Sequence, residues 1–293
     1  LSPSSAASDV YKRQIFIAPA LIFIFIFLLL PAILAFIYSF QNYNMLKPHA
    51  KVFVALQNYM EILKDPAFYK VLKNTVYFAA IVVPAQSAVA LLLALIVNAK
   101  IKTSKVARIC FFSPVITSMV VVSILWTFLY NKDNGMINSF LSQLGIPAQP
   151  FLLSEKQAMN SIIIMSIWQA AGYQMMIFLA GLQDVSPELY EAAQIDGANW
   201  WQKFTNVTLP GIQHVSNFVI LMTTIQAFKL FTQPYIMTGG GPNESTKTLA
   251  YMIYEQGFQY RNVGYSCAIA VLFFLIITVV SGILKKLIMK EED

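Results

Sequence analysis

The sequence predicts an all-α polytopic membrane protein, a bundle of six transmembrane helices. Composition is the first observation: 12% of the residues are charged and 57% are hydrophobic, with a mean hydropathy of +0.61. A soluble globular protein has about 25% charged residues. The second observation is that the charges gather in short clusters between long uncharged runs. Because crossing roughly 30 Å of hydrocarbon takes about 20 helical residues, each run is long enough to span a membrane.

Six stretches lack Lys, Arg, Asp and Glu over such a length. A chain in hydrocarbon must close its backbone hydrogen bonds internally, which favours helices. We therefore predict spans over residues 15–40, 75–97, 108–130, 158–182, 212–236 and 264–285. An even number of spans places both termini on one side of the membrane.

The first span follows a polar segment that contains Lys12 and Arg13. Basic residues before an apolar run also occur in secretory signal peptides. This run is longer than a signal peptide requires and no small-residue cleavage site follows it, so we predict a retained span. Our hypothesis is that the first dozen residues derive from a cloning or gene-calling artefact, and we assign them no function.

The segment NYMEILKDPAFYKVLKN, before the second span, is predicted to form a short amphipathic helix at the membrane interface. The Lys and Arg residues divide almost equally between the two sides of the predicted bundle. The charge bias that usually sets orientation is therefore small here.

Composition and motifs exclude several classes of function. The net charge of +6 comes from Lys and Arg at the ends of apolar runs rather than along one face, so we predict no nucleic-acid partner. Cys110 and Cys267 lie inside apolar runs without His or acidic neighbours, so we predict no metal site and no disulfide. His49 and His214 are isolated and no acid/base pair is evident, so we expect no enzyme and no cofactor.

The polar connection after the fourth span, LQDVSPELYEAAQIDGANWWQKFTNVTLPGI, has the local signals of two short helices. Ser186 can cap the first helix, with Pro187 at its first position. Gly197 suits a left-handed residue at its end. These signals predict a helix that begins and ends within the loop.

A second helix is predicted directly afterwards. Asn199 and Gln202 have the spacing of a capping box, and we expect Pro210 to end the helix. A plain helical hairpin that joins two spans would explain these signals equally well.

This loop resembles the EAA motif of ABC importer permeases, which is Glu-Ala-Ala, Asp-Gly-Ala, Phe, a β-branched residue and Leu-Pro. Val207 stands where the family usually has Ile. The other matching positions are Glu191, Ala192, Ala193, Asp196, Gly197, Ala198, Phe204, Leu209 and Pro210. The resemblance implies a type I importer permease whose cytoplasmic coupling loop, residues 184–211, docks on a separate ATP-binding subunit. It also implies that both termini are cytoplasmic.

A second resemblance follows the fifth span. The stretch FKLFTQPYIMTGGGPNESTKTLAYMIYEQGF is similar to the Thr-Gly-Gly-Gly-Pro signature of the carbohydrate-uptake branch, in its larger-type subunit such as the maltose and glycerol-phosphate permeases. Phe231, Thr238 and Thr246 also match. A lone Gly-Pro turn would be an ordinary loop, but this one lies after the EAA loop, as in the family.

The resemblance implies an organisation and a set of partners. We expect a tail over residues 1–14, a first helix and outer loop over 15–67, the importer transmembrane domain with five helices over 68–288, and a tail over 289–293. Implied partners are a second permease subunit, cytoplasmic ATP-binding subunits, an extracytoplasmic solute-binding protein and the lipid of a bacterial inner membrane. The implied solute is a sugar, an oligosaccharide or a glycerol-phosphate-like compound.

Polar side chains inside the fourth and fifth spans form one stripe on each helix, at positions i, i+3, i+4 and i+7. These stripes match the places where the maltose-type permease contacts its sugar. The predicted pathway residues are Ser166, Gln169, Ala170, Tyr173, Thr223, Gln226, Ala227 and Leu230. Hydroxyls and amides also hold helices together in ordinary bundles, so substrate contact and helix packing are both open interpretations.

Lys229 is the one charge at an uncertain depth, since it falls inside the predicted fifth span. It could extend outward to the interface or bind an anionic substrate.

Two other function classes compete with an ATP-driven importer. A secondary transporter would have internal repeats or broken helices with an ion site, and the sequence has no clear repeat and no acidic residue within a span. A structural membrane scaffold would have no use for an EAA-type loop. The chain has no GxxxxGK[ST] motif to hold ATP phosphates, so an importer of this kind needs a separate ATPase.

Overall fold

The computed structural model describes residues 16–47, 49, 51–99 and 104–289, and these are helical apart from loops and one two-stranded hairpin. The predicted tails, 1–14 and 289–293, lie outside the described residues except for Met289. The chain forms two compact units. Among the described residues, the first unit contains 16–65 with Ile253–Phe274, and the second contains Pro66–Met252 with 275–289.

Five helices in the described part of the chain are long and apolar enough to cross a membrane. They are Phe16–Ser39, Pro66–Asn98, Ala158–Asp184, Gln213–Met237 and Val263–Leu287. A sixth span exists if the bent pair Lys105–Ile116 and Met119–Leu129 counts as one. Each of the predicted spans thus has a helical counterpart, and the third differs from the prediction because it is broken.

The first unit begins with the helix Phe16–Ser39, which contains a π-turn, η1 (Phe25–Leu29), followed by α2 (Leu30–Ser39). Pro31 has no N–H to donate to the preceding turn. The wider turn is closed instead by the Leu30 N–H, which donates to the carbonyl of Phe25. The proline is therefore accommodated without ending the helix.

A short antiparallel hairpin follows, with β1 (Gln41–Asn42) opposite β2 (Val52–Phe53). It leads into α3 (Gln57–Lys64), a helix of the first unit. The unit is completed by a second π-turn, η4 (Glu255–Gln259), and by the first part of α15 (Val263–Met289). The N–H of Gly264 donates to the carbonyl of Tyr43 at 3.0 Å, which joins α15 to the chain after β1.

The predicted single amphipathic helix before the second span is wrong in its extent. Its first half is α3, but its second half is the beginning of the second span, α4 (Pro66–Asn98). The break lies at Asp65, which is extended with ψ 114°. A residue before proline is disfavoured in helical conformation, and Pro66 is well suited to begin a helix, so the boundary falls between them.

In the second unit, α4 packs along α8 (Ala158–Asp184) and α12 (Gln213–Phe228). Small residues on α4 allow α8 to approach closely. The buried cluster that they share consists of Ala90, Ala94, Val97, Ala171, Met175, Phe178, Leu179, Leu182, Val185, Ile212 and Val219. This core fixes the helices on which the predicted pathway residues lie.

The predicted third span is two helices, α5 (Ser104–Ile116) and α6 (Met119–Leu129), bent by 99°. Pro114 cannot donate to the carbonyl of Cys110, and the hydroxyl of Ser113 donates to it instead at 3.1 Å. The helix ends two residues later, and Ser118 is extended with ψ 132°. A run of apolar residues of spanning length therefore does not make one straight helix.

The predicted fifth span is interrupted as well. α12 ends at Phe228 and Lys229 caps it, so that the chain resumes helical structure only in α13 (Thr232–Met237). The remaining elements of the second unit are α7 (Met136–Gln143), the 3-10 turn η2 (Phe151–Leu153), α9 (Pro187–Ile195), α10 (Trp200–Lys203), the π-turn η3 (Phe204–Thr208) and α11 (Leu209–Gly211). α14 (Leu249–Tyr254) leads from the second unit into the first.

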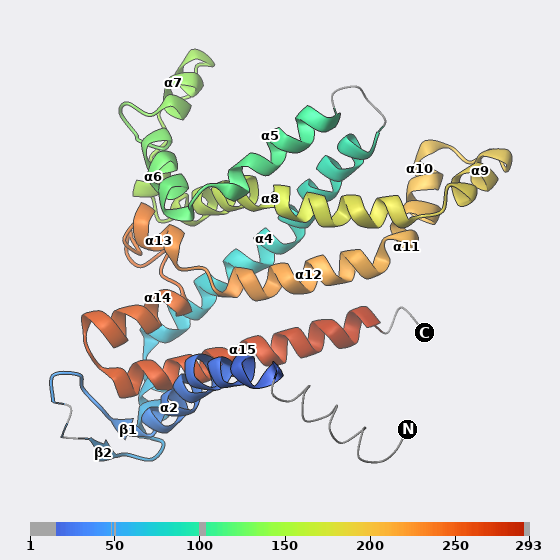
Figure 1. The fold of residues 1–293 in the computed structure, drawn as a ribbon. Helices are drawn as coiled ribbons and strands as arrows, with labels where there is room; N and C mark the ends of the chain where they lie inside the picture. The colour runs from blue at the N-terminus through green and yellow to red at the C-terminus, as the bar shows by residue number, and fades with distance from the viewer. Residues whose placement is uncertain (1–15, 48, 50, 100–103, 290–293) are drawn as a thin grey trace, which may run out of the picture. The chain divides into compact units, whose positions relative to one another are not determined.

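Within the second unit, α9, α10 and α11 lie together at one end of the α8 and α12 pair (Figure 1). The helices α6, α7 and α13 lie at its other end (Figure 1). The predicted coupling loop, residues 184–211, is thus at the opposite end of this unit from the Gly-rich signature that follows α13 (Figure 1).

Candidate functional site

The first helix of the coupling loop is capped as the sequence predicts. The Oγ of Ser186 accepts a hydrogen bond from the Glu188 N–H at 3.3 Å, and Pro187 is the first helical residue. Gly197 follows the helix in the left-handed region with φ 77°. Its N–H donates to Gln194 O at 3.1 Å, while the Ala198 N–H donates to Ala193 O at 2.9 Å. These two bonds form a Schellman motif, which satisfies carbonyls at the helix end.

The capping box is also confirmed. The Gln202 N–H donates to Asn199 Oδ1 at 2.9 Å, and the Asn199 N–H donates to Gln202 Oε1 at 2.8 Å. The prediction that Pro210 ends this helix is wrong, because helical structure continues to Gly211. As at Pro31, a π-turn comes first: the Leu209 N–H donates to the carbonyl of Phe204.

One side of the coupling loop is anchored to the core of the second unit. Tyr190 and Val207 pack against that core, and the hydroxyls of Tyr190 and Thr208 are 3.0 Å apart. The predicted coupling residues lie mostly on the other side. Those that are exposed are Glu191, Ala192, Asp196, Gly197, Leu209 and Pro210, and those that are half-buried are Ala193, Ala198 and Phe204.

The loop also exposes apolar residues that the sequence reasoning did not select. Trp200 and Trp201 are 67% and 61% exposed, and Ile195 is 87% exposed. The Trp200 ring stacks on Phe204 with centroids 5.6 Å apart. Large apolar side chains in water usually mark an interaction surface. Two consecutive tryptophans in a polar loop were the signal that could have identified them.

Between α4, α8 and α12, the second unit contains two adjoining cavities, of about 290 Å³ and about 150 Å³, which we call the transmembrane cavity. Both are lined by Gln86, Gln169, Ala170, Thr223 and Gln226. Tyr173 lines the larger cavity only, whereas Ser166, Ala227 and Leu230 line the smaller one only. The structure therefore brings all of the predicted pathway residues together around two adjoining, partly open cavities.

The hydrogen bonds around this space distinguish packing from open polar groups. Gln174 Nε2 donates to Thr223 Oγ1, which ties α8 to α12. Gln169 Nε2 donates to the carbonyl of Pro114 at 3.4 Å, at the bend after α5. In contrast, Ser166 Oγ is buried and has no hydrogen-bond partner among the described residues. A buried hydroxyl is normally paired, so an unpaired one beside a cavity is available to water or a solute.

Three glutamines of the transmembrane cavity were missed. Gln86 comes from α4, a helix whose polar residues the sequence reasoning did not examine. Gln174 is at position i+8 from Ser166, so extending the helical stripe by one residue would have found it. Gln233 lies after the interruption of the fifth span. Its position could not be extrapolated from a continuous helix.

Lys229 lines the smaller cavity and is exposed. It lies at the end of α12, where the chain leaves the helix. Its side chain is therefore placed beside the same space as Ser166 and Gln226 rather than on an outer helix face.

The Gly-rich signature after α13 forms a tightly bonded turn. Thr246 is fully buried, and its Oγ1 lies 2.7 Å from Thr238 Oγ1 and donates to Gly241 O at 3.0 Å. Thr248 is also fully buried and donates to the carbonyl of Leu230. Since Leu230 lines the transmembrane cavity, the signature fixes the position of one wall.

The signature is also bonded to α4. Asn74 Nδ2 donates to the carbonyls of Glu244 and Lys247, at 2.8 and 3.0 Å. The Leu249 N–H donates to Thr75 Oγ1 at 3.0 Å. The turn thereby links the beginning of the second span to the end of the fifth.

Comparisons with known proteins identify the family. The family model described as "Binding-protein-dependent transport system inner membrane component" matches residues 86–290. The probable ABC transporter permease protein YurN of Bacillus subtilis (strain 168) is 36% identical over 266 residues, which are 89% of this chain and 90% of that protein. The arabinooligosaccharides transport system permease protein AraP of the same organism is 35% identical, covering 93% of this chain and 87% of that protein. The lactose transport system permease protein LacF of Rhizobium radiobacter is 34% identical, with coverage of 91% and 90%.

Solved structures share the fold. A chain in the crystal structure of a bacterial alginate ABC transporter, in complex with an alginate pentasaccharide-bound periplasmic protein, superposes with a TM-score of 0.85 at 21% sequence identity. The match covers 97% of this chain and 96% of that chain. The importer permease fold that the sequence predicts is therefore confirmed, with five spans in the described residues, or six if the bent pair counts as one.

Proposed function

Because the chain belongs to the family of binding-protein-dependent transport system inner membrane components, we propose that it forms the transmembrane path for a sugar or oligosaccharide in an ATP-driven importer. The observation that carries this proposal is the transmembrane cavity, whose walls supply neutral hydroxyl and amide groups from α4, α8 and α12. Such groups both donate and accept hydrogen bonds, as sugar hydroxyls require. The names of AraP and LacF point to the same class of solute.

Substrate contact is proposed for the predicted pathway residues together with Gln86 and Gln174. Ser166 supports this role most strongly, because its buried hydroxyl has no partner in the described structure. Gln169 and Thr223 have partners, so they contribute first to the position of the helices. Lys229, which lines the smaller cavity, would favour a solute that carries a negative charge.

The coupling loop, residues 184–211, is proposed to dock on a separate cytoplasmic ATP-binding subunit. Its exposed Glu191, with Ile195 and the Trp200–Phe204 stack, offers one charge and an apolar surface for that contact. Reversing a two-state pore from 1:99 to 99:1 takes about 5.5 kcal/mol of differential binding. A few hydrogen bonds to a solute supply less than that, since each contributes about 1 kcal/mol net.

The topology that follows has both termini and the coupling loop in the cytoplasm. The hairpin, α3 and the Gly-rich signature are then extracytoplasmic. The complete importer would include a second permease subunit and a solute-binding protein on the outer side. Residues 68–288 would form the common importer domain and 15–67 an additional first span with its outer loop.

Reconstitution tests the proposed function directly. The complex of this chain with its co-purifying subunits is placed in proteoliposomes, and ATP-dependent uptake of labelled arabinooligosaccharide, lactose and maltose is measured with the binding protein present. We expect uptake of at least one sugar, and we expect Ser166→Leu to lower its rate at least about tenfold because Leu fills the smaller cavity. Leu144→Ala, on an exposed position outside the cavity, is the control.

Uptake that needs an ion gradient and no ATPase would overturn the importer assignment. Uptake by Ser166→Leu at the control rate would show that the cavity is not the path. A Lys229→Met variant tests whether the positive charge favours anionic solutes, since it should impair the uptake of an anionic sugar such as glucuronate more than that of a neutral one.

A further inference from the structure

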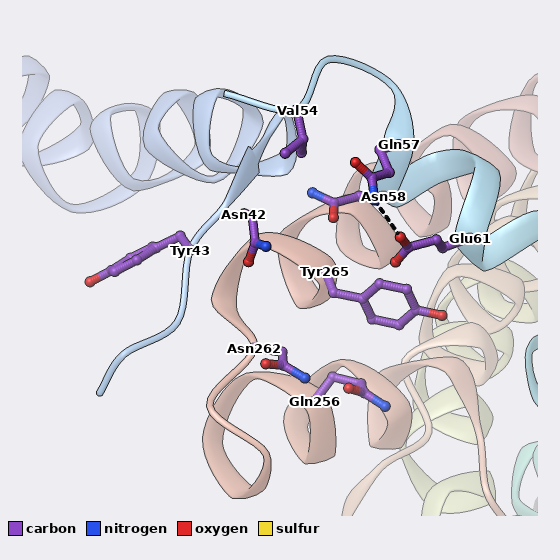
Figure 2. Close-up of a pocket in the computed structure, with 9 residues that line it drawn as sticks. All are labelled: Asn42, Tyr43, Val54, Gln57, Asn58, Glu61, Gln256, Asn262 and Tyr265. Atoms are coloured by element: carbon purple, nitrogen blue, oxygen red, sulfur yellow. Dashed lines mark hydrogen bonds between the residues drawn. The ribbon is translucent and has the colours of Figure 1, made fainter. Parts of the chain in front are cut away.

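The first unit has a cavity of its own, of about 300 Å³, which shares no lining residue with the transmembrane cavity. Its walls come from three segments that are far apart in the sequence: the end of β1, the helix α3 and the chain from η4 to the beginning of α15. Figure 2 shows side chains from these segments arranged around the same space. Because most of these side chains are amides, we call it the amide pocket.

The walls of the amide pocket are held by hydrogen bonds within the first unit. Asn58 is only 7% exposed, and its Nδ2 donates to the carbonyls of Ser39 and Gln41 at 2.8 and 3.0 Å. On the other side, the Asn262 N–H donates to the carbonyl of Gln256 at 2.8 Å. These bonds within the chain hold the pocket walls in place, which lowers the entropic cost of binding a ligand.

Several polar groups of the walls are left with unused hydrogen-bonding capacity. Gln57 Nε2 donates to one oxygen of Glu61 at 2.9 Å, so the second carboxylate oxygen is available (Figure 2). Asn262 Oδ1 accepts from Asn44 Nδ2 at 3.0 Å, which leaves the Asn262 amide N–H groups. The side chain of Gln256 forms no hydrogen bond within the described chain. The pocket therefore presents both donors and acceptors.

The side chains of the pocket walls limit which chemical class of ligand can bind. Glu61 is the single carboxylate and no Lys, Arg or His is among the described residues that line the pocket, so an anionic ligand would lack a counter-charge. One carboxylate is few for a calcium site, which uses six to eight oxygen ligands. Val54 is the one aliphatic side chain, so an apolar ligand is disfavoured too. A neutral ligand rich in hydroxyl groups fits, because hydroxyls pair with donors and acceptors alike.

We propose that the amide pocket is an accessory binding site for a neutral polyhydroxylated solute of the sugar or polyol class, separate from the transmembrane path. The proposal rests on the proposed function for the solute class and for the extracytoplasmic location of α3 and the hairpin. Occupancy of the pocket holds solute on the side from which import starts.

Ligand-observed NMR tests this site. The full-length chain with its partner subunits is placed in lipid nanodiscs, and saturation transfer to methyl α-glucoside, maltose and glucuronate is measured at millimolar concentration. The test variant is Gln256→Leu, which removes an amide that bonds nothing else in the described structure, so its folding should be preserved. The matched control is Gln169→Leu, which alters the transmembrane cavity instead.

We expect the saturation transfer that depends on the amide pocket to reach a neutral sugar but not glucuronate. We expect Gln256→Leu to weaken the affinity of the amide pocket for the neutral sugar by about threefold to tenfold, the effect of one hydrogen bond. Gln169→Leu should leave the affinity of the amide pocket unchanged. Asn58→Ala should lower the melting temperature, and Gln256→Leu should not. That result would support a structural role for Asn58 in the pocket wall and a ligand-contact role for Gln256.

Equal affinity of the wild type and Gln256→Leu would overturn the accessory site. A signal that only Gln169→Leu removes would assign all binding to the transmembrane path, and the proposed function would stand without the amide pocket. A signal that Gln256→Leu removes, in a complex that takes up no sugar with ATP, would support the amide pocket and overturn the proposed function.

Discussion

Gly197 offers the sharpest test of the coupling loop, because its replacement has one physical consequence. Its φ of 77° is in the left-handed region, and no atom lies within 4 Å of where a Cβ would be. Gly197→Ala therefore costs only backbone strain, about 1–2 kcal/mol. That free energy lowers the ratio of native to non-native loop conformations by about 5- to 30-fold if the loop can refold locally.

The assay compares ATP-dependent uptake, solute-stimulated ATP hydrolysis and membrane insertion in the same preparations. We expect Gly197→Ala to reduce uptake several-fold while insertion is normal, and Gly197→Asn to be milder because Asn tolerates the left-handed region. Gly145→Ala is the matched control, since Gly145 has φ 73° and equally open surroundings in a different loop. Normal coupled uptake by Gly197→Ala, or an equal loss in Gly145→Ala, would show that the left-handed turn at Gly197 does not matter for coupling.

Three further predictions follow from the second unit. Gly172→Ala should destabilise the protein by about 1–3 kcal/mol, because its Cβ would lie 2.1 Å from the Phe111 carbonyl oxygen, whereas Gly282→Ala should not; thermal melting in detergent compares them. Thr223→Val removes the hydroxyl that Gln174 bonds, and should lower stability by about 1–3 kcal/mol in the same assay. Asn199→Ala breaks the capping box and should cost about 1 kcal/mol, seen as faster hydrogen exchange at Gln202; unchanged exchange there would contradict the cap.

Local features of the site were predictable because they depend on neighbours in sequence. Ser186, Gly197 and the Asn199–Gln202 pair form the caps that their residue types and spacing indicate. A cap is decided by a side chain and backbone groups two or three residues away, so no tertiary contact is needed to recognise it.

Helical continuity was not predictable in the same way. Pro31 and Pro210 lie within helices because a π-turn precedes each, while the span that contains Pro114 breaks two residues beyond it. Whether a proline ends a helix depends on what satisfies the released carbonyl. At the third span, the bend is supported by Gln169, a residue 55 positions away from Pro114.

A helical membrane protein with a capped polar loop could be predicted from the sequence, because hydrophobic run length and local capping are properties of consecutive residues. Which polar side chains face one another depends on how the helices pack. Ser166 and Thr223 share the same helical stripe pattern, yet Thr223 is bonded across to α8 and Ser166 is left open beside the cavity. The difference arises from helix packing, which brings Gln174 to one hydroxyl and nothing in the described chain to the other.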